Sequence, residues 1–186
     1  MKKVIPFVIL IFVVIGGILI WQANQKDKTE SKPLTQEQRM ESASNIGEVH
    51  LHASFLIFTN GTKRVFTDTK YHQRDTRAHL HTSTPSVIHV NLLPVTWQEF
   101  FDSLPSPMKV ETNCFTTGTN QKFCTEGNTT LKFFLNGQLL DPTILASTIN
   151  DGDMFLISFG AENENQLQNQ LNQLPNPKLL NLNPAE

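Results

Sequence analysis

The chain has 186 residues, of which 39% are hydrophobic, and a formal net charge of -2. This length and composition predict one modest globular domain with extensions rather than two domains. A slightly acidic chain has no basic field with which to hold phosphates, so we expect no nucleic acid partner.

The N-terminal segment predicts a single membrane anchor. An apolar run from Val4 to Trp21 follows Lys2 and Lys3, contains no charged side chain and matches the ~20 residues needed to cross the hydrocarbon core. A cleaved signal peptide is the alternative, but Trp21 is too bulky for the -3 position of a cleavage site at Ala23. We therefore expect residues 1–22 to form an uncleaved signal-anchor, a transmembrane helix that contacts the membrane through residues 4–21.

Composition divides the rest of the chain into three parts. Residues 23–46 are polar and charged without apolar periodicity, which predicts a linker. Residues 47–160 hold the candidate domain, and residues 161–186 form an Asn/Gln-rich tail. Leucines at helical spacing, Leu167, Leu171 and Leu174, predict one short helix in the tail. We expect this helix to pack on the domain or to fray in solvent, and we favour either outcome over a partner-binding role.

The domain begins with a predicted β-hairpin. Two strand-like runs, 49–58 and 63–68, flank Asn60-Gly61, and Asn-Gly is a strong hairpin signal because both positions accept a positive φ. In the register set by this turn, His52 would oppose Thr69 and His50 would oppose Tyr71.

The remaining predicted elements alternate strands with short helices. A strand over 86–92 leads to Thr96, which forms a capping box with Glu99 and starts a helix that ends at Pro105. Further strands are predicted at 108–112, 130–135, 138–140 and 154–159. This order predicts an α+β fold that resembles the β-grasp (ubiquitin-like) plan, a mixed sheet with one main helix, with an insertion between 68 and 86.

Cys114 and Cys124 are the only cysteines, and they bracket a loop with two turn formers. A structural disulfide is the favoured interpretation, and it requires an oxidising compartment. Two unpaired thiols are the alternative. The spacing is far from the Cys-x-x-Cys arrangement of redox-active pairs. Together with the anchor, the cysteines predict a single-pass protein of the cell membrane whose C-terminal domain is extracytoplasmic.

All six histidines fall between His50 and His89. The pairs His50/His52 and His79/His81 are both His-x-His, which on a strand points two imidazoles to one face about 7 Å apart. Parity places Leu51, Ala53, Phe55 and Ile57, together with Ile88 and Val90, on the core face, and it places these histidines, with His89, on the other face. His72 is expected to point away from them.

These histidines predict a metal site with His79, His81, His89, His50 and His52 as candidate ligands. Neutral imidazoles suit zinc or copper and are poor ligands for calcium or magnesium. The alternative is that they are ordinary exposed polar residues on the outer face of a half-buried sheet, bonded to Asp75 or to backbone.

Enzymatic patterns are sparse, so catalysis is the less favoured interpretation. No Gly-x-Ser-x-Gly elbow, glycine-rich phosphate loop or His-Glu-x-x-His sequence is present. Asp151 and Asp153 stand in Asn-Asp-Gly-Asp, which is more typical of a turn than of an acid and base pair. We predict no catalytic residues.

Several segments of the domain stand out together: His79-Leu-His81, Val87-Ile-His-Val90, Thr96 to Leu104 with Phe100-Phe101, the Cys114 and Cys124 pair, Leu131 to Gly137, and Asp151 to Gly160. Taken together, they resemble a family of uncharacterised membrane-anchored proteins of small-genome bacteria and some archaea, which are sometimes labelled protein-disulfide isomerase. The resemblance covers about residues 47–160.

The resemblance implies that His79, His81 and His89 are the main set, with His50 and His52 secondary. Two positions differ from the family: Thr82 and Ser83 stand where an Asp often follows His-x-His, and Asn91 stands where a further His often occurs. The isomerase label gains no support from this chain, because it lacks both Cys-x-x-Cys and a thioredoxin βαβ pattern.

The sequence therefore predicts a non-enzymatic, extracytoplasmic domain that binds zinc or copper through histidines or that mediates interactions with an envelope protein. One alternative is a metal-dependent enzyme in which three histidines leave a coordination position open for activating water. Another is a structural adaptor without metal.

Overall fold

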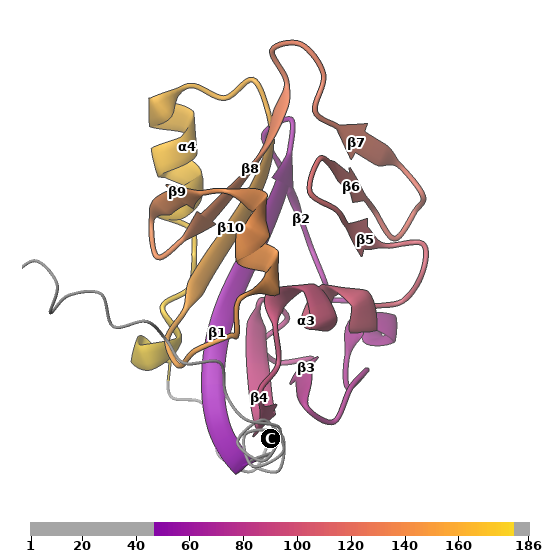
Figure 1. The fold of residues 1–186 in the computed structure, drawn as a ribbon, viewed down its shortest axis with the longest axis vertical. Helices are drawn as coiled ribbons and strands as arrows, with labels where there is room; N and C mark the ends of the chain where they lie inside the picture. The colour runs from indigo at the N-terminus through magenta and orange to yellow at the C-terminus, as the bar shows by residue number, and fades with distance from the viewer. Residues whose placement is uncertain (1–46, 181–186) are drawn as a thin grey trace, which may run out of the picture. The chain divides into compact units, whose positions relative to one another are not determined.

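The computed structural model describes residues 47–180, with the side chains described from Val49 onward, as a mixed α+β fold dominated by β-sheet with two α-helices (Figure 1). The predicted anchor at residues 1–22 and the whole of the predicted linker at 23–46 lie outside the described residues. Within residues 47–180, no helix is both long and apolar enough to cross a membrane.

The main sheet is mixed, and its strand order is β3-β4-β1-β10-β8-β9. The two central strands, β1 (Gly47–Thr59) and β10 (Met154–Gly160), are parallel, although they come from opposite ends of the domain. On one side β1 pairs antiparallel with β4 (Val87–Leu93), which pairs with β3 (Ala78–Leu80). On the other side β10 pairs antiparallel with β8 (Thr130–Leu135), which turns at Asn136-Gly137 into β9 (Gln138–Leu140).

The predicted capping box starts α3 (Trp97–Ser103). The Thr96 hydroxyl accepts from the Glu99 amide at 3.2 Å, and the Glu99 carboxylate accepts from the Thr96 amide at 2.8 Å, so two otherwise unpaired helix donors are satisfied. The helix buries Trp97, which stacks on Phe155 of β10 with ring centroids 4.5 Å apart. This contact fixes α3 on one face of the sheet.

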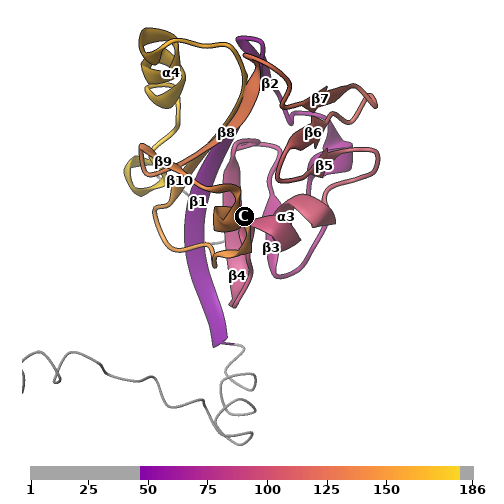
Figure 2. The ribbon, with the colours of Figure 1, turned by 45° about the horizontal axis from the view of Figure 1, so that its top comes forward.

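The outer face of the central strands is covered by the C-terminal segment. Asn163 caps α4 (Glu164–Leu171), and a short 3-10 turn, η3 (Pro177–Leu179), follows. Leu174 is buried and, together with Leu167 and Leu171, packs in a second apolar cluster formed by Leu56, Phe58, Phe134 and Leu156. Figures 1 and 2 show α4 on the opposite side of the molecule from the small sheet described next. The folded part thus continues beyond Gly160, the predicted end of the domain, to residue 180.

A second, three-stranded sheet lies beside the main one (Figure 2). It contains the disulfide. Its strands are β5 (Lys109–Val110), β6 (Cys114–Thr116) and β7 (Lys122–Cys124). Cys114 and Cys124 are direct cross-strand partners and form the predicted disulfide. The prediction placed a strand at 108–112 but missed β6 and β7, because three-residue strands show too little alternation to detect.

The predicted hairpin is shorter than expected. Thr59 opposes Thr62, as the Asn-Gly turn requires, but β2 (Thr62–Arg64) ends after three residues. Residues 65–68 form no strand, and Phe66 is buried in the main core beside Phe55. The predicted pairing of His52 with Thr69 and of His50 with Tyr71 is therefore wrong, since β4 is the neighbour of β1 at that level.

Two further 3-10 turns complete the described elements: η1 (Thr69–Tyr71) in the connection between β2 and β3, and η2 (Pro142–Ala146) before β10. Asp68 and Asp141 cap them by accepting from the amides of Lys70 and Thr143. Such short capped turns satisfy backbone donors where the chain reverses.

Candidate metal centre

A row of three histidines crosses three neighbouring strands. His89 on β4 is the direct cross-strand partner of His52 on β1 and of His79 on β3. Side chains alternate between the faces of a sheet, and the flanking pairs Ala53–Ile88 and Ala78–Val90 are buried in the main core. The three imidazoles therefore share the face opposite the main core, as parity predicted.

His50 and His81 lie beside this row, one toward each end of β4. Strand β4 runs antiparallel to both β1 and β3, so His50, two residues before His52, lies toward one end of β4. His81, two residues after His79, lies toward the other end. The ring centroid of His89 is 4.4 Å from that of His50 and 5.2 Å from that of His81. Five of the six histidines thus form one cluster centred on His89.

His50, His52 and His89 have the geometry of a metal-ligand set. One ring nitrogen from each lies within 4.8 Å of the others. Two nitrogens bound to one zinc ion at 2.0–2.1 Å in tetrahedral geometry are about 3.3 Å apart, so modest side-chain rotations would bring the three onto one ion. His50 is exposed and His52 partly so, whereas His89 is only 6% exposed, so an ion can approach from the His50 side.

His79 and His81 form a closer pair. Their Nε2 atoms are 3.2 Å apart, and His79 lies nearly parallel to His89 with ring centroids 5.4 Å apart. His79 Nδ1 donates to the backbone carbonyl of Asp75 at 3.1 Å. A carbonyl oxygen can only accept, so Nε2 of neutral His79 holds the free lone pair that faces His81.

His72 is not part of the cluster. Its Nε2 donates to the Phe66 carbonyl at 2.9 Å, and its Nδ1 lies 3.1 Å from the Thr82 hydroxyl. Both nitrogens therefore have partners outside the cluster, although the strand register from which the sequence analysis expected His72 to point away does not form.

The cluster favours neutral imidazole. Burial, and then the charges of the four surrounding histidines, lower the pKa of His89 to about 4. Burial followed by His50 lowers the pKa of His52, against an opposing effect of the Asp151 carboxylate. Burial followed by His81 lowers the pKa of His79. Only the neutral ring binds a metal ion, so these three ligands stay available below the usual pH range of histidine.

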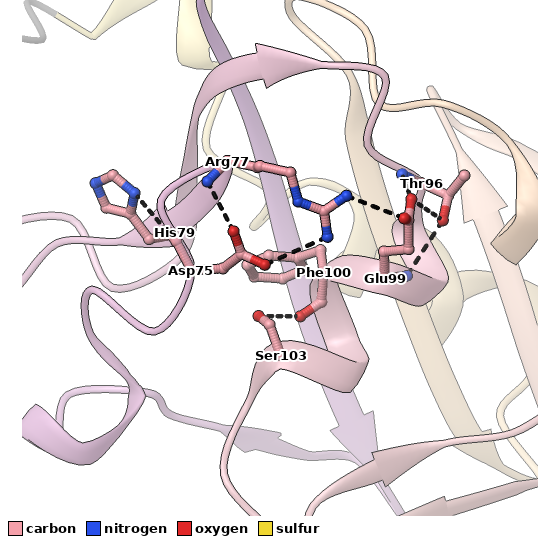
Figure 3. Close-up of polar contacts among 7 residues, drawn as sticks. All are labelled: Asp75, Arg77, His79, Thr96, Glu99, Phe100 and Ser103. Carbon is pink, nitrogen blue, oxygen red and sulfur yellow. Dashed lines mark hydrogen bonds and ion pairs between the residues drawn. The ribbon is translucent and has the colours of Figure 1, made fainter. Parts of the chain in front are cut away.

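A chain of polar contacts holds His79 in place (Figure 3). The Asp75 carboxylate accepts from the Arg77 amide at 2.7 Å and from the Arg77 guanidinium at 3.3 Å. Arg77 also donates to Glu99 at 3.1 Å, and Glu99 caps α3. The loop whose carbonyl orients His79 is thereby tied to the helix. Carbonyls that accept from the second nitrogen of a ligating histidine are common around metal sites.

The sequence proposed Asp75 as a partner for a histidine, and its backbone carbonyl, rather than its carboxylate, has that role. The contribution of Arg77 and Glu99 was missed. It depends on a contact between residues 22 positions apart, for which the sequence offers no local signal.

The Asn-Asp-Gly-Asp segment reaches the same region as a turn. The Asp151 carboxylate accepts from the His52 amide at 3.2 Å, and the Gly152 amide donates to the His52 carbonyl at 2.8 Å. Asp153 is buried, and its two carboxylate oxygens accept from the Asn136 side chain and the Asn150 amide. Both aspartates therefore have structural partners, as the turn interpretation predicted.

Comparison of the chain with protein-family models, curated proteins and solved structures gave no match.

Proposed function

We propose that this chain is a membrane-anchored, extracytoplasmic domain that binds zinc or copper through its histidine cluster. The observation that carries the proposal is the convergence of His50, His52 and His89, each offering a ring nitrogen within 4.8 Å of the others. Histidine-rich sets without carboxylates suit zinc or copper rather than calcium or magnesium.

The charges and contacts within the cluster support the same proposal. Five imidazoles on one face, three of them with lowered pKa values, repel one another when protonated. A bound cation would instead satisfy the ring nitrogens that face one another. The carbonyl of Asp75 on His79 Nδ1 is the kind of outer partner that orients a ligand.

The location is supported by the apolar run at residues 4–21 and by the Cys114–Cys124 disulfide, which persists in oxidising compartments. An envelope protein is the expected macromolecular partner. The sheet plan supports a β-grasp assignment: the first and last strands, β1 and β10, are parallel at the centre, and the main helix follows the strand paired with β1. The fold by itself carries no function.

Metal binding can be tested on the full-length chain purified in detergent without a polyhistidine tag. After dialysis against zinc or copper and removal of free metal, elemental analysis should find bound metal at pH 7.5. His89→Ala should lose metal, and His72→Ala should retain it, because both ring nitrogens of His72 have other partners. Equal metal content in His89→Ala and the unmodified chain would reject the proposal.

A further inference from the structure

The histidine cluster contains more imidazoles than one ion uses. Zinc in proteins takes four ligands, and open sites use three protein side chains. His50, His52 and His89 already form such a set of three. His79 on β3 and His81, which directly follows that strand, remain; both lie on the other side of β4 from β1.

We propose that His79 and His81 hold a second metal ion, so that the cluster has two metal positions on either side of His89. This inference rests on the proposed metal-binding function and deepens it. The first position is made by His50, His52 and His89. The second has two protein ligands, and its remaining coordination positions are open to water or to a donor group from an incoming partner.

The distance within the second pair already fits a metal ion. Two nitrogens 3.2 Å apart, each about 2.05 Å from a zinc ion, subtend an angle of about 100° at the ion, close to tetrahedral. The same distance is shorter than the roughly 4 Å that separates the nitrogens of a linear two-coordinate arrangement. In the metal-free protein a proton between the two Nε2 atoms takes this place, and the ion would replace it.

The ring contacts separate the two positions. His50 and His52 contact each other with centroids 4.7 Å apart, His79 and His81 do the same at 4.7 Å, and each pair contacts His89. The first pair belongs to β1 and the second to β3 and the residue after it, with β4 between them. An ion between His79 and His81 therefore need not share ligands with the first ion.

The second position is also the better oriented of the two. His79 is fixed by its bond to the Asp75 carbonyl, and the Asp75 loop is fixed by Arg77 and Glu99. Because the nitrogens lie at ligation distance before any ion binds, little side-chain rearrangement is needed.

The test is the number of zinc ions per chain. The full-length chain in detergent, without a polyhistidine tag, is dialysed to equilibrium against zinc chloride, and zinc and protein are quantified. We expect two ions per chain for the unmodified protein and for the control His72→Ala, and one ion for His81→Ala and for His79→Ala.

His81 lies outside the strands, so His81→Ala is the variant least able to disturb the fold, and circular dichroism verifies it. Long-range proton–nitrogen NMR of the unmodified chain gives an independent readout: the Nε2 signals of His79 and His81 should shift as zinc is added, and unchanged signals at zinc saturation would overturn the second position.

One ion per chain in the unmodified protein, with unchanged content in His81→Ala, would overturn the second position and leave the proposed function standing. Two ions retained in the double variant His79→Ala/His81→Ala would also overturn it. Absence of zinc from every sample would overturn the second zinc position, and absence of copper after the same dialysis would overturn the proposed function as well.

Discussion

Acidification of the metal-free protein should weaken its fold, because His89 is neutral in the folded state. Its pKa falls from 6.5 to about 4 when the protein folds. Between these values the unfolded chain binds a proton that the folded chain does not, so stability is full above about pH 6.5 and is lost as the pH falls toward 4. The interval of about 2.5 pH units, at about 1.4 kcal/mol per unit, corresponds to a loss of about 3.5 kcal/mol in the free energy of unfolding.

The measurement is the free energy of unfolding by urea at a series of pH values, in the presence of a chelator, on the compact unit from residue 45 to residue 186. His89→Gln has no titrating ring at this position, so its stability should fall less steeply between pH 6.5 and 4. The lowered pKa values of His52 and His79 leave part of the slope in both proteins. His72→Gln is the control and should keep the full slope. Equal slopes for His89→Gln and the unmodified unit would refute the reasoning.

Three other perturbations have defined outcomes. Reduction of the Cys114–Cys124 disulfide, whose sequence separation is 10, should lower the free energy of unfolding by about 3 kcal/mol, and an unchanged urea midpoint would contradict this. Asp153→Ala leaves Asn136 and the Asn150 amide without their acceptor and should destabilise the fold by about 1–3 kcal/mol, with no effect on metal content. Arg77→Gln removes the ion pairs that hold the loop whose carbonyl orients His79, and it should weaken zinc binding about 10–100-fold in calorimetry. The control Lys109→Met removes an exposed ion pair elsewhere and should leave zinc binding unchanged.

Local patterns in the sequence predicted the face of the histidines. Alternation along 51–57 and 88–90 assigned Ile88 and Val90 to the core and His89 to the other face. In the structure Ile88 and Val90 lie in the main core, and His89 lies between them in the strand, on the opposite face. The Thr96–Glu99 capping box and the disulfide were likewise visible, because each depends on residues close in the chain.

The arrangement of the cluster could not be predicted, because it depends on which strands become neighbours. The hairpin rule fixes the register at the turn but contains no information on where β2 ends. The sequence analysis therefore extended the pairing of β1 with β2 over too many residues. Strand β2 ends at Arg64, and Phe66 is buried in the core. Beyond the end of β2, the strand that pairs with β1 is β4. This long-range pairing, rather than any local motif, brings His89 between His52 and His79.

The C-terminal tail shows the same limit. The spacing of Leu167, Leu171 and Leu174 indicated a helix, and α4 forms over Glu164–Leu171. Its docking site, however, consists of residues from β1, β8 and β10, and a helix of eight residues has little stability without such packing. Soluble fragments for the experiments above should therefore retain residues 161–180.

The most direct test of the central claim is the metal content of the full-length chain, purified in detergent without a polyhistidine tag and dialysed against zinc or copper at pH 7.5. Metal should remain bound after free ions are removed, and the melting temperature should rise; an excess of one hundred times the dissociation constant corresponds to about 2.7 kcal/mol. His89→Ala should lose the ion held by His50, His52 and His89, and its melting shift should be smaller. A chain that holds neither metal and shows no melting shift with either would contradict the account, and would favour an adaptor without metal.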